Sequence, residues 1–117
     1  MIEFIIERTK GKFIAKCSSE QKFTYNSPKI DSLKNKIVRD LESKLGYVPP
    51  LLFRYSLKSY LTELRPFLRY SLIANYAGLT SVTLSYYISG ERNPTEQSFF
   101  QTISAVQQIL HDLKLYK

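Results

Sequence analysis

The chain has 117 residues, 44% of them hydrophobic, which is enough apolar surface to fold as one domain or as two very small ones. Its one Cys and one His exclude an internal disulfide and a zinc site made of four such ligands, and no apolar run reaches the roughly 18 to 20 residues that span a membrane. With 17 Lys and Arg against 10 Asp and Glu, the formal charge of +7 favours a polyanionic partner, either a nucleic acid or an acidic protein surface.

The N-terminal residues alternate between apolar and polar types, as expected of strands with one buried face. This pattern covers residues 2–7 and 13–17, with turn-forming residues at 9–12, so we expect a β-hairpin. Cys17 falls on the apolar face and is expected to be a small buried hydrophobe. Lys22 to Tyr25 is predicted to add a short third strand.

A helix is expected to start at Ser27 and Pro28, because Ser can cap a first turn and Pro fits the first helical position. Gly46 then stands where a left-handed C-terminal cap is needed. Residues 51–55 are predicted to form one more strand, and Pro50 before it is compatible with an edge position. The apolar residues of the helix form one stripe for packing on the hairpin: Ile30, Leu33, Ile37, Leu41 and Leu45.

From Ser56 onward the spacing of apolar residues becomes helical. Ser56 is expected to cap a helix that ends near Pro66, and two more short helices are predicted at residues 69–77 and 80–89. A last helix is predicted from about Thr95 to Tyr116. Its apolar residues are spaced for packing on a core or on a partner helix: Phe99, Ile103, Val106, Leu110 and Leu113.

The segment at residues 73–85 carries the functional signal. Two helices that cross through a tight turn need a small residue where they meet and a glycine at the turn, and Ala74 and Gly78 fit those roles. Thr80 is placed to cap the second helix. The core of such a unit is expected to contain Ile73, Ala77, Leu79, Leu84 and Ile88, with Tyr87 also at a core-facing position.

This segment, IANYAGLTSVTLS, resembles the helix-turn-helix of lactose-repressor and lambda-repressor-like regulators. The following YISGERNP, at residues 87–94, is similar to an ending common in the same superfamily. The resemblance implies that residues 80–88 form a recognition helix that enters the major groove of double-stranded DNA.

The resemblance also gives each candidate contact a role. Ser81 and Ser85 would bond base edges, and Val82 would touch a thymine methyl group. Tyr86 would reach a base or a phosphate, although half-buried packing explains it equally well, and Thr83 would hold a phosphate. The candidate DNA-binding residues are Arg69, Thr80, Ser81, Val82, Thr83, Ser85, Tyr86 and Arg92, with Arg65 as a further flanking cation. The outward side of this recognition helix lacks Arg, Lys, Asn and Gln, so a single helix would discriminate only weakly between base sequences. We therefore expect a homodimer that binds two half-sites.

The order of the N-terminal elements resembles that of HicB-type antitoxins and their solitary relatives. It implies an alternative function, in which residues 1–55 bind and neutralise a small RNA-cleaving toxin and the protein autoregulates its operon. Residues 1–55 hold 11 Lys and Arg against 6 Asp and Glu, whereas residues 56–117 hold 6 against 4. Lysines along the hairpin are interpreted as a solvated sheet edge or as contacts to an acidic partner: Lys10, Lys12, Lys16 and Lys22.

The sequence therefore predicts an α+β protein of two domains. Residues 1–55 form a small antiparallel sheet with one helix, HicB-like, and residues 56–117 form an all-α helix-turn-helix domain of four to five helices. We expect a non-enzymatic, cytoplasmic DNA-binding regulator without cofactor or metal. His111 lies beside the apolar stripe of the last helix and is expected to be a surface or interface residue, because no nucleophile and base can be assembled around it.

Overall fold

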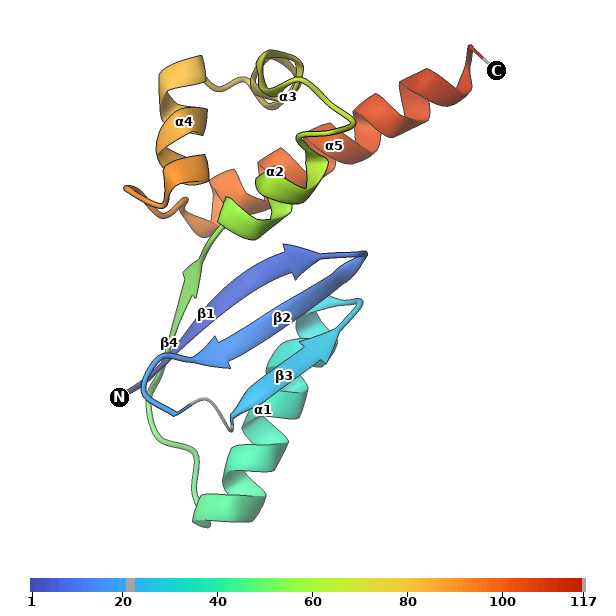
Figure 1. Cartoon of the computed structure of the whole chain (residues 1–117). Coiled ribbons are helices and arrows are strands. Elements are labelled where there is room, and N and C mark those ends of the chain that lie inside the picture. Colours follow the sequence, from blue (N-terminus) through green and yellow to red (C-terminus); the bar gives the residue numbers. More distant parts are fainter. Residues whose placement is uncertain (21–22, 117) are drawn as a thin grey trace. The chain divides into compact units, whose positions relative to one another are not determined.

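The computed structural model describes residues 1–20 and 23–116. Within these ranges the chain is α+β, with four strands and five helices, and it divides into two compact units, Met1–Arg54 and Tyr55–Lys117 (Figure 1). We call these the N-terminal unit and the C-terminal unit. None of the helices in the described part has the length and apolar character needed to cross a membrane.

The sheet begins with the hairpin of β1 (Ile2–Thr9) and β2 (Lys12–Cys17). Lys10 and Gly11 form its turn with φ of 46° and 79°, which matches the twist of the flanking strands. The strand order is β3-β2-β1-β4, with β3 (Thr24–Ser27) antiparallel to β2 and β4 (Leu51–Tyr55) at the other edge, as expected for a strand that follows Pro50.

Two expectations about the sheet are wrong. The sheet is mixed and not purely antiparallel, because the helix after β3 returns the chain to the end where β1 begins and β4 then runs alongside β1 in the same direction (Figure 1). A hydrogen bond of 2.9 Å from the amide of Ile2 to the carbonyl of Pro50 joins the two strand starts. Lys12 and Lys16 also do not protect an edge, since they lie on β2, an interior strand, and Lys16 lies 3.7 Å from Glu7 in an ion pair; of the other two predicted lysines, Lys10 is in the turn and Lys22 is outside the described residues.

The third strand is displaced from its expected position: it begins at Thr24 and continues to Ser27, while Lys22 lies outside the described residues. This displacement also moves the start of α1 (Ile30–Leu45). Ser27 is buried as the last residue of β3, and its hydroxyl accepts a hydrogen bond of 3.3 Å from the amide of Lys29 instead of capping the helix. Pro28 is therefore outside the helix, and the predicted helix start is wrong.

One face of the sheet packs against α1. The register places Phe4 opposite Cys17 and Ile6 opposite Ala15, and all four side chains are buried, which confirms the expectation for Cys17. Three residues of the predicted helix stripe are completely buried against them, Leu33, Ile37 and Leu41, whereas Leu45 in the last turn is 41% exposed. Gly46 ends the helix with φ of 80°, as predicted.

The C-terminal unit consists of four helices: α2 (Lys58–Leu64), α3 (Tyr70–Ala77), α4 (Ser81–Ser89) and α5 (Glu96–Lys114). Ser56 does not cap α2, because Leu57 is fully buried at the N-cap position and the hydroxyl of Ser56 only accepts a 3.4 Å bond from the amide of Lys58. The core is built from apolar residues of all four helices, among them Leu61, Ile73, Leu84, Phe99 and Val106.

The apolar stripe of α5 follows the prediction only through its first half. Phe99, Ile103 and Val106 are buried, but the stripe then continues to Ile109, while Leu110 and Leu113 are 48% and 53% exposed. A straight α-helix drifts away from a strict repeat of 3.5 residues, so the face that packs on α3 rotates away from Leu110. Beyond that point α5 extends past α3 to the C-terminus (Figure 1).

Candidate nucleic-acid interface

The helices α3 and α4 are joined by Gly78, Leu79 and Thr80. Gly78 has φ of 69°, a left-handed conformation that costs a side-chain-bearing residue strain, and its amide and that of Leu79 donate to carbonyls of the last turn of α3. A Cβ added at Gly78 would meet only the Nε2 of Gln101, at 3.6 Å. The backbone conformation, and not lack of space, therefore makes glycine the suitable residue at this turn.

The second helix begins with the predicted cap. The hydroxyl of Thr80 accepts a 3.1 Å hydrogen bond from the amide of Thr83 and donates one of 2.9 Å to the hydroxyl of Thr83. Thr80 is therefore occupied in holding the first turn of α4. Thr83 keeps its own hydroxyl proton, so it remains able to donate to an oxygen outside the helix.

One face of α4 packs into the core of the unit. Leu84 is 1% exposed and Tyr87 is 8% exposed, so Tyr87 is a packing residue. This helix packs on α2 and α3, and Ala74 and Ala77 of α3 are buried as well. Of the remaining expected core positions, Ile73 is buried, while Leu79 and Ile88 are only half-buried.

The opposite face of α4 points to solvent. Ser81 and Ser85 are exposed, and Val82 between them has 62% of its surface exposed, whereas Tyr86 at the side of this face is half-buried. A hollow of about 70 Å³ lies beside this face, between the start of α3 and α4. The hollow is lined by Tyr70, Ser71, Ser81, Leu84, Ser85 and Ile88. The face thus combines small hydroxyl side chains with one exposed apolar group, a composition suited to contacting the edges of bases.

The predicted cations lie at both ends of this helix pair. Arg69 immediately precedes α3, and Arg92 follows α4, where its guanidinium carbon lies 4.4 Å from the centroid of the Tyr86 ring. Arg65 lies at the end of α2. All three are exposed, and among the residues that the structure describes none of them is in an ion pair with a carboxylate. Their charges are available to a polyanion.

Two contributions to this surface were missed by the sequence analysis. Ser71 adds a third exposed hydroxyl beside Ser81 and Ser85, and the Lys58 side chain passes within 3.6 Å of where a Cβ on Gly90 would lie, which adds a cation near the end of α4. Both depend on how α2 and α3 pack against α4, which local spacing does not encode. The one available signal was that each lies at the start of a predicted helix.

Hydrogen bonds fix α3 and α5 relative to each other. The hydroxyl of Tyr76 donates to Asp112 at 2.8 Å, and the amide of Gln108 donates to the other carboxylate oxygen at the same distance. The bond from Tyr76 is the main reason that the pKa of Asp112 is lowered, and it also raises the pKa of Tyr76. Tyr76 thus anchors the helix pair and does not belong to the exposed face of α4.

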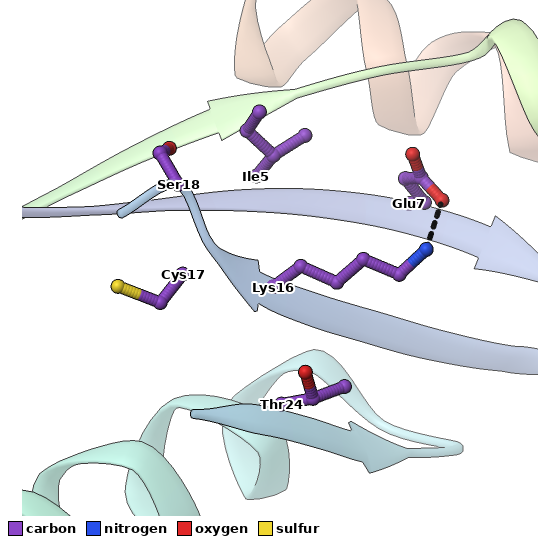
Figure 2. Close-up of a pocket in the computed structure, with 6 residues that line it drawn as sticks. All are labelled: Ile5, Glu7, Lys16, Cys17, Ser18 and Thr24. Carbon is purple, nitrogen blue, oxygen red and sulfur yellow. Dashed lines mark ion pairs between the residues drawn. The ribbon is translucent and has the colours of Figure 1, made fainter. Parts of the chain in front are cut away.

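A separate pocket of about 400 Å³ lies in the N-terminal unit (Figure 2). Figure 2 shows Lys16 extended along β2 toward the carboxylate of Glu7 on β1, so the two charges in this pocket offset each other. Cys17 also lines it, and its thiol lies 3.6 Å from the hydroxyl of Ser19. No cluster of three His, Cys, Asp or Glu side chains suited to a metal occurs in residues 1–20 or 23–116. The cationic, hydroxyl-rich surface of α4 is therefore the stronger candidate site.

Comparisons with protein-family models, with curated proteins and with solved structures found no match to this chain.

Proposed function

We propose that the protein is a non-enzymatic, sequence-specific DNA-binding regulator in which α3 and α4 form a helix-turn-helix and α4 enters the major groove. One observation carries this proposal. The helix α4 buries Leu84 and Tyr87 while it presents Ser81, Val82 and Ser85 to solvent, between arginines that pair with no carboxylate of the described residues. A helix with one rigidly packed face and one exposed face fits a groove that admits a single helix.

In this proposal the exposed residues divide into two classes. Ser81, Val82 and Ser85 contact base edges and determine the preferred sequence, because hydroxyls bond either donors or acceptors and Val82 packs against a thymine methyl. Arg69 and Arg92, together with the free hydroxyl proton of Thr83, contact phosphates and position the helix. Thr80 acts indirectly, through the cap on α4.

We further propose that the protein works as a homodimer. A reading face of two serines and one valine offers no bidentate contact, so two half-sites about one helical turn apart are needed for tight and specific binding. Two surfaces are available for the second copy. One is the exposed apolar end of α5, made of Leu110, Leu113, Leu115 and Tyr116. The other is an edge of the sheet at β3 or β4.

The test is fluorescence anisotropy of the full chain on a duplex from the region upstream of its own gene and on a scrambled duplex of equal length, over a series of salt concentrations. Sequence-specific binding predicts a preference for the upstream duplex that persists at about physiological salt. Equal binding to the two duplexes that is lost as the salt concentration rises would show that the interaction depends on charge alone. Absence of binding to either duplex would direct attention to a protein partner of the N-terminal unit.

A second candidate function concerns that unit. The face of its sheet not covered by α1 carries Ile5 and Ile14, both half-buried, between the Glu7–Lys16 and Glu3–Arg54 ion pairs. A surface that combines apolar side chains with ion pairs suits a protein partner. It supports the alternative function, in which an antitoxin binds a small RNA-cleaving toxin on this face. A short adjacent reading frame whose product co-purifies with this chain, and is released by Ile14→Glu, would favour it.

A further inference from the structure

The end of α4 holds the loop after it in one conformation. Gly90 adopts φ of 82°, and the amides of Gly90 and Arg92 both donate to the carbonyl of Tyr86, at 3.1 and 3.3 Å. The hydroxyl of Ser89 donates to the same carbonyl at 3.2 Å. Three donors on one oxygen turn the chain back on itself, so the backbone of Arg92 lies beside the last turn of α4 instead of extending into solvent.

The side chain of Arg92 is also held. Its guanidinium carbon lies 4.4 Å from the centroid of the Tyr86 ring, a distance at which the cation is attracted to the face of the ring. Stacking occupies the flat face of the guanidinium and leaves the N–H donors along its edge available. Arg92 is exposed and, within the described part of the chain, it is not paired with a carboxylate. Its donors are therefore oriented and unoccupied.

We propose that Tyr86 is a positioning residue for Arg92: its ring holds the guanidinium beside the end of α4, and the free edge of the guanidinium grips one phosphate of the bound DNA. This inference rests on the proposed DNA-binding function and assigns Tyr86 to the phosphate-binding part of the site. Tyr86 is assigned to the phosphate contact and not to base reading, because Arg92 covers a face of its ring and the residue is half-buried, whereas Val82, one turn earlier on the same side of α4, is 62% exposed.

A backbone phosphate is the ligand that this geometry favours. A planar guanidinium matches two phosphate oxygens with two parallel N–H donors, and its position beyond the end of α4 lies outside the part of a recognition helix that contacts bases. The side chain of Lys58 passes close to Gly90 and adds a second cation on this side of the helix. Because the ring limits the motion of Arg92 before DNA binds, less side-chain freedom is lost on binding.

The experiment is a double-mutant cycle in the full chain, measured by anisotropy on the preferred duplex and on a scrambled duplex. Tyr86→Leu removes the ring face and should weaken binding to both duplexes alike by about two- to fivefold, whereas Tyr86→Phe keeps the ring and should bind like the parent chain. Arg92→Ala should weaken binding to both duplexes and lower the slope of log affinity against log salt by about 0.9. The combined Tyr86→Leu and Arg92→Ala variant should bind no worse than Arg92→Ala.

The control variant is Tyr47→Leu, which removes a 63% exposed tyrosine from the N-terminal unit and should leave DNA binding unchanged. In the free protein, the Arg92 side-chain protons should show an upfield ring-current shift by NMR that is kept in Tyr86→Phe and lost in Tyr86→Leu. Additive losses in the cycle, or a changed sequence preference in Tyr86→Leu, would overturn the positioning role and leave the proposed function intact. Absence of binding by the parent chain to every duplex would overturn both.

Discussion

The side-chain amide of Gln101 donates a hydrogen bond of 2.5 Å to the carbonyl of Ala77, which joins α5 to the last residue of α3. The carbonyls at a helix end have no partner within the helix, so this bond satisfies one of them at the turn before α4. We expect Gln101→Ala to lower the free energy of unfolding by about 1 kcal/mol. Urea unfolding followed by circular dichroism measures this change.

The matched control for that variant is Gln107→Ala on the same helix, where the glutamine is exposed. It should change the free energy of unfolding by less than about 0.5 kcal/mol. If both variants are equally destabilised, the contact with Ala77 has no special role and the loss reflects the helix itself.

The N-terminal unit should lose stability in acid through Asp40. The hydroxyl of Tyr25 donates to Asp40, and Lys44 lies 3.1 Å from the same carboxylate oxygen; the two contacts, Tyr25 first, lower the pKa of Asp40 below its ordinary value of 3.8. A carboxyl group whose pKa is lower in the folded state than in the unfolded state contributes its full stabilisation at pH values above the unfolded-state pKa. It loses that contribution as the pH falls through the folded-state pKa. The stability difference between the parent chain and Tyr25→Phe should therefore be larger at pH 7 than near pH 3.

Urea unfolding of both proteins at the two pH values measures this difference, and NMR titration of Asp40 should show its pKa closer to 3.8 in Tyr25→Phe. Tyr47→Phe, which alters an exposed tyrosine of the same unit, is the control. A stability difference that does not depend on pH would show that the Tyr25 hydroxyl acts without the charge of Asp40.

Substitutions on the two parts of the proposed DNA-binding surface should have different signatures. Ser85→Ala removes an exposed hydroxyl that we propose contacts a base, and it should change which duplex is preferred, with a loss of about 1–3 kcal/mol on the duplex whose base it contacts. Arg69→Ala should weaken binding to all duplexes alike and reduce the salt slope by about 0.9. Selection from a random duplex library distinguishes the two signatures. A uniform loss from Ser85→Ala would remove Ser85 from the reading face.

The exposed end of α5 predicts a change in oligomeric state. Leu113 is 53% exposed and lies near Leu110, Leu115 and Tyr116, all of which expose a large part of their surface. If the proposed dimer forms through this end of α5, Leu113→Glu should yield a monomer in sedimentation equilibrium, with an unchanged circular dichroism spectrum and weaker DNA binding. Val48→Glu, which changes a 40% exposed residue of the N-terminal unit, should leave the dimer intact. A dimer that survives Leu113→Glu would move the proposed interface to a sheet edge.

Local features of the fold could be predicted where a single residue determines the backbone. Gly46 and Gly78 adopt the left-handed conformation, and Thr80 caps α4, as their residue types and positions indicated. The start of α1 could not be predicted in this way, because Ser27 fits both a helix cap and the end of a strand. Ser27 ends a strand because it pairs with β2 and is buried, and both of these are properties of the whole unit.

The candidate site was predictable to a similar extent. The exposure of Val82 and the burial of Leu84 follow from the helical period, and the structure agrees with both. The stacking of Arg92 on Tyr86 depends on the reversal of the chain at Gly90, which spacing along the helix does not describe. A glycine after a helix, with an arginine two residues beyond it and an aromatic residue in the last turn, is the signal that would have indicated this contact.

Selection of duplexes from a random library with the full chain, at about physiological salt, shows whether α4 reads DNA as part of a dimer. We expect enrichment of one inverted repeat, with half-site centres about 10 base pairs or a multiple of that spacing apart, and loss of the enriched sequence with Val82→Lys. Recovery of duplexes without a common sequence, or with the same sequence from the parent chain and from Val82→Lys, would contradict this expectation.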